Sequence, residues 1–254
     1  MKIFALAFLL AFFLQGGLFA PSSQARDYVP VGSAGVKLPA RQSSGVARKL
    51  TAKPPSSLSS PSRTYVTPTG KIKLFGTVEF GKPISSLPIW LDVLKRNADD
   101  PIFQLTKHFN KSVTWAKLKE RLEGKSTLEQ LRLVNSFWNG WPYKEDPVNW
   151  GKQDYWAIPA EFLVKSGDCE DYAIVKYFTL KELGVDPQSM RLVILRDTVR
   201  NLSHAVLAVY LNNDVYILDN VSNSMLSHKS LGNYAPQYSV NEFGRWAHIV
   251  PKNG

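Results

Sequence analysis

Between residues 88 and 184, four stretches carry apolar side chains at the spacing of an amphipathic helix. The first begins at Pro88, which suits the first turn of a helix, and the second covers residues 112–122. The third opens with the capping-box sequence Ser126-Thr127-Leu128-Glu129 and continues to Trp138. The fourth runs from about residue 169 to Gly184, a residue type that commonly ends a helix. We therefore expect four helices in this part of the chain.

After residue 184 the apolar pattern becomes that of strands. Such runs cover residues 190–195, 203–211 and 214–219, and a looser one lies earlier, at 74–80. Asn212-Asn213 suits a two-residue turn with positive φ, so Leu211 is predicted to pair with Asp214. Helices followed by antiparallel strands indicate the α+β class, with N-terminal helices packed on an antiparallel sheet. Residues 72–254 are enough for one domain with a full core.

The first 25 residues have the composition of a secretory signal peptide. Lys2 provides the positive start, residues 3–14 are apolar, and Ser23-Gln24-Ala25 offers small residues for cleavage after about Ala25. The alternative is an uncleaved membrane anchor, but the apolar run is shorter than the roughly 20 residues that a spanning helix needs. We therefore expect the mature chain to be exported. With a single cysteine it cannot form an internal disulfide.

Residues 26–71 form a Ser/Pro-rich basic segment that we interpret as a disordered linker. They hold eight Lys and Arg residues against one acid, Asp27, and so account for most of the net charge of +10. The remaining domain is nearly neutral, which argues against nucleic-acid binding, since that function needs a basic folded surface. The segment could contact anionic lipid headgroups or cell-wall polymers, or it could simply be solvated.

Cys169 is the only cysteine and falls at the predicted start of the fourth helix, with Asp168 near the N-cap. A helix N-terminus stabilises a thiolate, and the thiolate is the nucleophilic form of cysteine. The alternative is a small buried residue without chemistry, because free cysteines are often buried. The sequence of the hairpin that follows favours the first interpretation.

The predicted register of that hairpin places His204 and Asp219 as diagonal neighbours on one face. A cysteine nucleophile needs an imidazole to take its proton and a carboxylate to orient that imidazole. Taken alone, His204 is more simply a partly buried histidine and Asp219 a turn residue. Their coincidence with a single exported cysteine favours a catalytic triad of Cys169, His204 and Asp219.

Three carboxylates, Asp168, Glu170 and Asp171, crowd the predicted nucleophile. Unpaired, they would raise the pKa of the thiol and suppress the thiolate. Either they serve as helix caps that point away, or a cation neutralises them. Oxygen ligands suit Ca²⁺, whereas zinc is disfavoured because no Cys or His cluster is present.

The segment 143–158 is rich in aromatic residues, which are typical of a core or of the wall of a cleft. The backbone N–H of Cys169 would serve as one oxyanion-hole donor. We consider the indole N–H of Trp156 as the second.

The residues from Gly167 to Ile174, with the sequence GDCEDYAI, resemble the bacterial transglutaminase-like cysteine proteinases. The segments Ser203-His204-Ala205-Val206-Leu207 and Leu218-Asp219-Asn220 support the resemblance. Further similarity lies in the sequence DYWAIP at 154–159 and YSVNE at 238–242. The resemblance as a whole covers about residues 72–250.

The resemblance implies a papain/transglutaminase-like core and a Cys169-His204-Asp219 triad. It implies calcium dependence, with Asp168 and Glu170 matching the calcium-linked acids of the family and Asp171 as a third candidate. It further implies a periplasmic endopeptidase that cleaves the N-terminal region of a large surface adhesin and so controls biofilm attachment. An inner-membrane receptor for cyclic di-GMP would sequester the enzyme. Two alternatives stay open: a cell-wall peptide amidase or transglutaminase, and a non-catalytic binding module.

Overall fold

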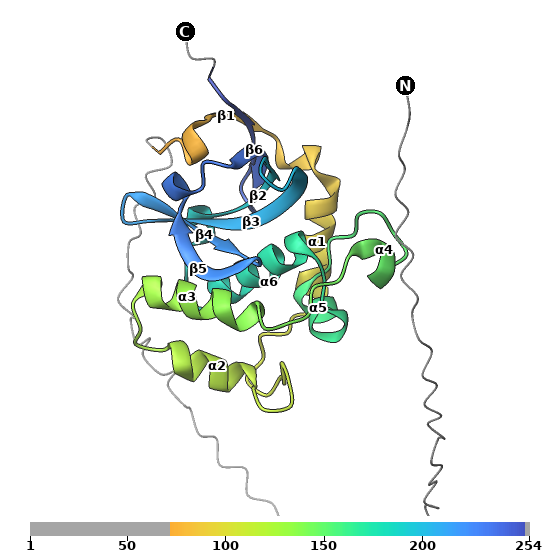
Figure 1. Cartoon of the computed structure of the whole chain (residues 1–254). Helices are drawn as coiled ribbons and strands as arrows, with labels where there is room; N and C mark the ends of the chain where they lie inside the picture. The colour runs from red at the N-terminus through yellow and green to blue at the C-terminus, as the bar shows by residue number, and fades with distance from the viewer. Residues whose placement is uncertain (1–71, 252–254) are drawn as a thin grey trace, which may run out of the picture. The chain divides into compact units, whose positions relative to one another are not determined.

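The computed structural model describes residues 72–251, so the predicted signal peptide at 1–25 and the basic linker at 26–71 lie outside the described residues. Six α-helices and seven strands make up the described part (Figure 1). The helices are α1 (Pro88–Asp99), α2 (Trp115–Leu122), α3 (Thr127–Trp138), α4 (Asp146–Asn149), α5 (Pro159–Lys165) and α6 (Cys169–Glu182).

The four predicted helices are present as α1, α2, α3 and α6, and their ends follow the capping signals. The capping box of α3 forms, because the Ser126 hydroxyl accepts from the N–H of Glu129 and the Glu129 carboxylate accepts from the N–H of Ser126. Helix α2 begins at Trp115, three residues later than predicted, because Thr114 caps it by accepting from the N–H of Lys117. Two short helices, α4 and α5, were not predicted, because they have too few turns for a clear hydrophobic period.

All strands belong to one antiparallel sheet with the order β1-β7-β6-β2-β3-β4-β5. Their bounds are β1 (Val78–Lys82), β2 (Met190–Asp197), β3 (Leu202–Leu211), β4 (Asp214–Asp219), β5 (Ser222–Ser227), β6 (Tyr234–Val240) and β7 (Arg245–Ile249). Only the second half of the early strand prediction, 74–80, is correct, since Leu74–Gly76 forms a 3₁₀ turn. The α+β class is confirmed.

The β3–β4 hairpin has the predicted register, with Leu211 paired to Asp214 and Leu207 to Leu218. Asn212 and Asn213 both have positive φ, at 53° and 61°, as a two-residue turn requires. This turn fixes which residues share a face along the whole hairpin.

Side chains from the two faces of the sheet enter separate cores. Leu207 and Val209 of β3 point into the larger core, which also contains the buried residues of α1, α2, α3 and α6. Val206 and Ala208 point to the opposite face, into a smaller core closed by Leu74. Figure 1 shows the helices gathered on one side of the sheet, with α6 next to it. The start of α6 is thereby held against the strands that carry the predicted catalytic residues.

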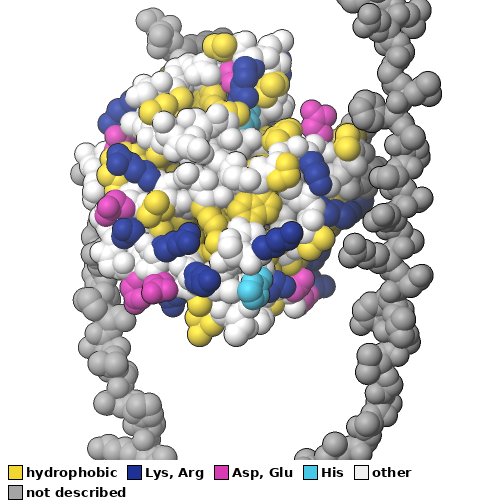
Figure 2. Space-filling view, turned by 60° about the horizontal axis from the view of Figure 1, so that its bottom comes forward, with side chains coloured by type: hydrophobic (Ala, Val, Ile, Leu, Met, Phe, Trp, Pro, Cys, Tyr) yellow, Lys and Arg dark blue, Asp and Glu magenta, His cyan; other side chains and the backbone are white. Residues whose placement is uncertain are grey.

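Among the helices of residues 72–251, none is long and apolar enough to cross a membrane. On the face seen in Figure 2, lysine and arginine side chains are dispersed among polar, apolar and acidic ones rather than gathered in a patch.

Candidate active site

Cys169 is the first residue of α6, as predicted, and the backbone before it is closely packed. Ser166 adopts φ 64° and ψ −163°, a region that is normally restricted to glycine. A Cβ on Gly167 would lie 2.0 Å from Oδ2 of Asp171, so only glycine fits there. Asp171 in turn accepts from the N–H of Ala157 (2.6 Å) and of Asp168 (3.3 Å). The conformation that presents Cys169 is therefore fixed by contacts with two neighbouring segments.

His204 and Asp219 form the predicted pair on the face of the hairpin that carries the smaller core. Nε2 of His204 lies 2.9 Å from Oδ1 of Asp219, and both residues are buried. Asp219 also accepts from the hydroxyl of Tyr234 (2.6 Å) and from the N–H of Val221 (3.0 Å). These donors hold the pKa of Asp219 below its ordinary value despite its burial. An ionised carboxylate accepts only, so Nε2 carries the imidazole proton and Nδ1 is the basic ring nitrogen.

One cavity of about 480 Å³ brings Cys169 and His204 together with Asp168, Glu170 and Trp156, whereas Asp171 and Asp219 lie outside its lining. Its wall includes Cys169 from α6, His204 from β3, and Trp156 from the segment before α5. Tyr143 and Tyr238 add aromatic surface. Cys169 is half-buried and lines this cavity, so its thiol is accessible, as that of a nucleophile must be.

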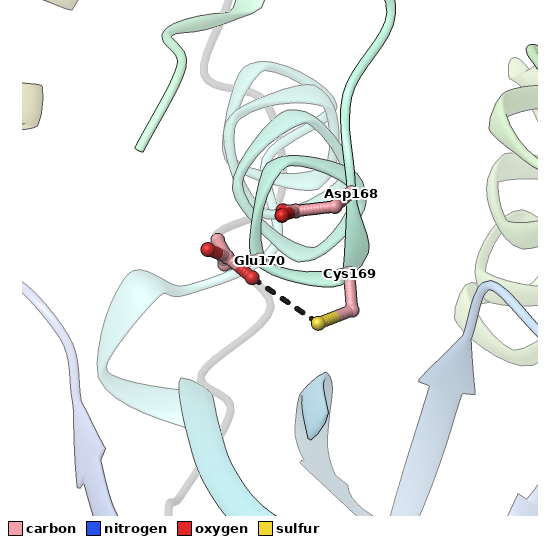
Figure 3. A group of neighbouring side chains, drawn as sticks. All are labelled: Asp168, Cys169 and Glu170. Atoms are coloured by element: carbon pink, nitrogen blue, oxygen red, sulfur yellow. Dashed lines mark hydrogen bonds between the residues drawn. The ribbon is translucent and has the colours of Figure 1, made fainter. Parts of the chain in front are cut away.

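The environment of Cys169 opposes ionisation of the thiol. Its Sγ lies 3.1 Å from Oε2 of Glu170, and Figure 3 shows the Glu170 carboxylate turned toward the sulfur at the start of α6. Burial raises the pKa of Cys169 well above its ordinary value, and the charges of Glu170 and Asp168 raise it further. A hydrogen bond from the backbone of Ala205 acts in the opposite direction. The helix N-terminus alone therefore does not produce a thiolate. This agrees with the expectation from the sequence that the neighbouring carboxylates raise the pKa of the thiol.

The acidic cluster beside Cys169 is larger than the sequence suggested, since Asp146 and Asp154 join it. Oxygens of Asp146, Asp154 and Glu170 lie within 4.8 Å of one another, and so do those of Asp146, Asp168 and Asp171. Oδ1 of Asp146 and Oδ1 of Asp168 are both buried without a hydrogen-bond partner. Burial and the neighbouring carboxylates raise the pKa of Asp168 far above its ordinary value, and burial raises that of Asp146 to about 6.

Crowded, desolvated carboxylate oxygens without donors are the ligand set of a hard divalent cation, and the residues present fit Ca²⁺. Asp168, Glu170 and Asp146 would provide ligands. Asp171 lies within the cluster, but each of its carboxylate oxygens already accepts from a backbone N–H. Asp146 and Asp154 were not predicted as ligands, although both stand in the aromatic segment 143–158, because their distance along the chain from Cys169 gives no spacing signal.

Trp156 is buried in the cavity wall, where its carbonyl oxygen accepts from Arg96 (2.7 Å) and its ring packs on Trp90. Arg96 is held in turn by Glu161, 2.7 Å away. The indole is thus part of the site, and its role as an oxyanion donor stays a prediction.

The fold and the cavity define a cysteine hydrolase of the transglutaminase-like class. The profile of the bacterial transglutaminase-like cysteine proteinases (BTLCP) matches residues 107–253, and the chain belongs to this family. The comparison with curated proteins gave no match.

Three solved structures of LapG from Legionella pneumophila are similar to this chain, each with 33% sequence identity and a TM-score of 0.50. The match covers 62% of this chain and 86% of the calcium-bound LapG structure. A second LapG structure is covered to 86% and an EGTA-treated one to 84%. LapG was thus solved both with calcium bound and after treatment with EGTA.

Proposed function

We propose that this chain is a calcium-dependent cysteine endopeptidase with the triad Cys169, His204 and Asp219. The observation that carries the proposal is that His204 lines the same cavity as Cys169 and lies 2.9 Å from Asp219. The nucleophile comes from α6, the base from β3 and the orienting carboxylate from β4. These three groups are the ones that acyl transfer by a thiol requires.

In this mechanism, Nδ1 of His204 accepts the thiol proton as Sγ attacks the carbonyl carbon of the scissile peptide bond. Asp219 holds the imidazole in the required tautomer and stabilises the imidazolium that forms. His204 then returns the proton to the departing amine, which leaves an acyl group on Cys169. Water, activated by the same imidazole, hydrolyses this thioester. The N–H of Cys169 and the indole of Trp156 are the proposed donors to the oxyanion.

The carboxylates of Asp146, Asp168 and Glu170 would hold the calcium ion. A bound cation supplies positive charge beside a thiol whose ionisation these carboxylates otherwise oppose. The protein's own part is to keep the ligands buried at the start of α6, where their geometry is coupled to that of Cys169.

We further propose that the enzyme acts in the periplasm, after removal of residues 1–25, on the N-terminal region of a large surface adhesin. An inner-membrane receptor for cyclic di-GMP would bind and sequester it. These steps rest on the family and on the similarity to LapG. The basic segment 26–71 has no assigned role in them.

The reaction is tested by identifying the products. The purified chain is incubated with an N-terminal adhesin fragment in calcium, and the products are analysed by mass spectrometry, with Cys169→Ala as the matched control. Two adhesin peptides that sum to the substrate plus one water are expected from the wild type and are expected to be missing with the variant.

Other products would indicate the other chemistries of this fold. A new isopeptide bond would indicate a transglutaminase, and cleaved peptidoglycan peptides would indicate a cell-wall amidase. If neither substrate changes and iodoacetamide does not label Cys169 at neutral pH, the domain is a binding module and the proposal is wrong.

A further inference from the structure

A lysine lies fully buried behind the catalytic hairpin, on the same helix as the nucleophile. Lys176 is two turns along α6 from Cys169, and its relative exposure is 0%. Lysine is almost never fully buried unless its ammonium group is paired. The partners of its Nζ are two side-chain amides, Oδ1 of Asn135 at 2.8 Å and Oδ1 of Asn139 at 2.7 Å.

These two contacts determine which way both amides face. Because each Oδ1 accepts from Lys176, each Nδ2 group is turned to the opposite side as a donor. Nδ2 of Asn135 donates to the carbonyl oxygen of Ser222 (2.9 Å). Nδ2 of Asn139 donates to the carbonyl oxygens of Asp219 (2.9 Å) and Ser222 (3.0 Å). The buried amine of Lys176 on α6 therefore orients two donors on α3 toward one turn of the sheet.

That turn, residues 219–222, joins β4 to β5 and carries the triad carboxylate. We propose that Lys176 is a positioning residue for the triad: through Asn135 and Asn139 it fixes the backbone of Asp219 and thereby the orientation of His204. The inference rests on the proposed Cys169-His204-Asp219 mechanism. Tyr234 and Val221 hold the Asp219 carboxylate itself, so the amides complete a set of contacts around that residue.

The burial of this lysine argues that its hydrogen bonds are needed. An apolar side chain would fill the space between α3 and α6 without the cost of desolvating an amine. That cost is visible, because burial lowers the pKa of Lys176 to about 7, while the charge of Asp219 raises it. The interaction with Asp219 places Lys176 within the electrostatic reach of the triad.

The test uses iodoacetamide as the probe, because Cys169 is the only thiol of the chain. In alkylation, a bond forms between Sγ and the methylene carbon as iodide leaves, and the imidazole takes the thiol proton. The full chain is compared with Lys176→Met at neutral pH and saturating calcium. We expect alkylation of Cys169 to slow about tenfold or more in the variant. We also expect the NMR signal of the His204 Nε2 proton to move upfield, since its hydrogen bond to Asp219 weakens.

Thr179→Val is the matched control. Thr179 is equally buried on α6 and accepts from the Trp138 indole of α3 at 2.9 Å, but it does not contact the 219–222 turn. We expect Thr179→Val to lower the melting temperature, to leave the alkylation rate within about twofold of the wild type, and to leave the NMR signal of the His204 Nε2 proton at its wild-type position. If Lys176→Met does not fold, Asn139→Asp replaces it, because this change keeps the acceptor for Lys176 and removes the donor to Asp219.

His204→Ala separates failure of the inference from failure of the proposed mechanism. If His204→Ala slows alkylation and Lys176→Met or Asn139→Asp does not, the triad stands and the positioning role is wrong. If Thr179→Val slows alkylation as much as Lys176→Met, the effect is general packing between α3 and α6, and the positioning role is also wrong. Full reactivity of His204→Ala would overturn the triad and this inference with it.

Discussion

At the scale of single residues, Asp219 is the most constrained member of the site. Its two carboxylate oxygens accept from His204, Tyr234 and Val221, and its carbonyl oxygen accepts from Asn139. A charged group that is buried to this degree is tolerated because both of its oxygens accept hydrogen bonds. The consequence is a carboxylate that is ionised and immobile before substrate arrives.

Replacing Asp219 by Asn should therefore lower the proteolytic kcat by roughly a thousandfold or more, because the amide reverses the preferred imidazole tautomer. Combining Asp219→Asn with His204→Ala should cost little beyond the larger single effect, since the residues act as a unit. Steady-state kinetics of the three variants measure this. Asp186→Asn, in a 3₁₀ turn that does not line the cavity, is the control. Additive losses in the double variant would show that the two residues act separately.

Tyr234→Phe removes one donor to Asp219 and leaves the ring in place. We expect kcat to fall about tenfold, with a stability loss of about 1.5–3 kcal/mol, because the lost hydrogen bond is made to a charged group. Tyr210→Phe is the comparison, because Tyr210 is a buried tyrosine of the same small core whose hydroxyl contacts Glu79 at a long 3.5 Å. The kcat of each variant is measured, and a denaturant titration gives its stability. Equal kcat values for the two variants would show that the Tyr234 hydroxyl has no role in catalysis.

At the scale of elements, the start of α6 combines two demands. The helix must present Cys169 to the cavity, and it must tie back the segment around Ala157 through Asp171. Gly167 allows both, because a side chain there would displace the Asp171 carboxylate. A Cβ on Gly167 would lie 2.6 Å from the Cβ of Asp171, so a shift of a few tenths of an ångström would not relieve the clash.

Gly167→Ala should accordingly destabilise the protein by about 2 kcal/mol or more, since Asp171 must give up its backbone donors. Gly232→Ala should be close to neutral, because a Cβ at Gly232 meets nothing within 4 Å. Thermal or chemical unfolding of both variants measures the difference. A stable and active Gly167→Ala protein would contradict the close packing described at this position.

The same elements show how far sequence reasoning reaches. The β3–β4 hairpin was predictable because Asn212-Asn213 sets a two-residue turn, and its register follows from simple pairing. The capping box of α3 and the glycine after α6 were equally local signals. The proximity of Cys169 to His204 was suggested by their residue types and by the family resemblance, since no short-range pattern connects α6 to β3.

The missed features depend on tertiary contacts. Strands β5, β6 and β7 carry weak alternation, because their side chains face two different environments and their burial is mixed. Asp146 approaches Asp168 only because the segment 143–158 folds back over the start of α6. Lys176 looks like an ordinary polar position on a helix, and its burial becomes apparent only when α3 and β4 are packed beside it.

At the scale of the whole molecule, the acidic cluster links metal binding to stability. Asp146 has a folded-state pKa of about 6 against an ordinary value of 3.8, and that of Asp168 is raised further. Without metal, the folded protein therefore binds more protons than the unfolded chain over this range. The contribution of Asp146 to the stability of the folded protein is fully present below about pH 3.8 and is lost as the pH rises through about 6.

At the proposed site calcium would replace those protons, so its stabilising effect should grow as the pH rises. We expect the increase in melting temperature at saturating calcium to be larger near neutral pH than near pH 5, with protons released on binding. Asp146→Asn should weaken calcium binding and reduce the pH dependence, whereas Asp186→Asn should change neither. Calorimetry in buffers of different ionisation enthalpy measures both the affinity and the proton release. A calcium affinity that is the same across this range would contradict the assignment of the buried carboxylates as ligands.

The proposed function requires that calcium at the carboxylate cluster enable Cys169 and His204 to cleave a peptide bond. The decisive measurement is the rate at which the wild-type chain cleaves the N-terminal adhesin fragment in calcium, after chelation, and after calcium is returned. We expect cleavage that chelation abolishes, that calcium restores, and that Cys169→Ala lacks under every condition. Unchanged cleavage after chelation, or cleavage by Cys169→Ala at the wild-type rate, would contradict it.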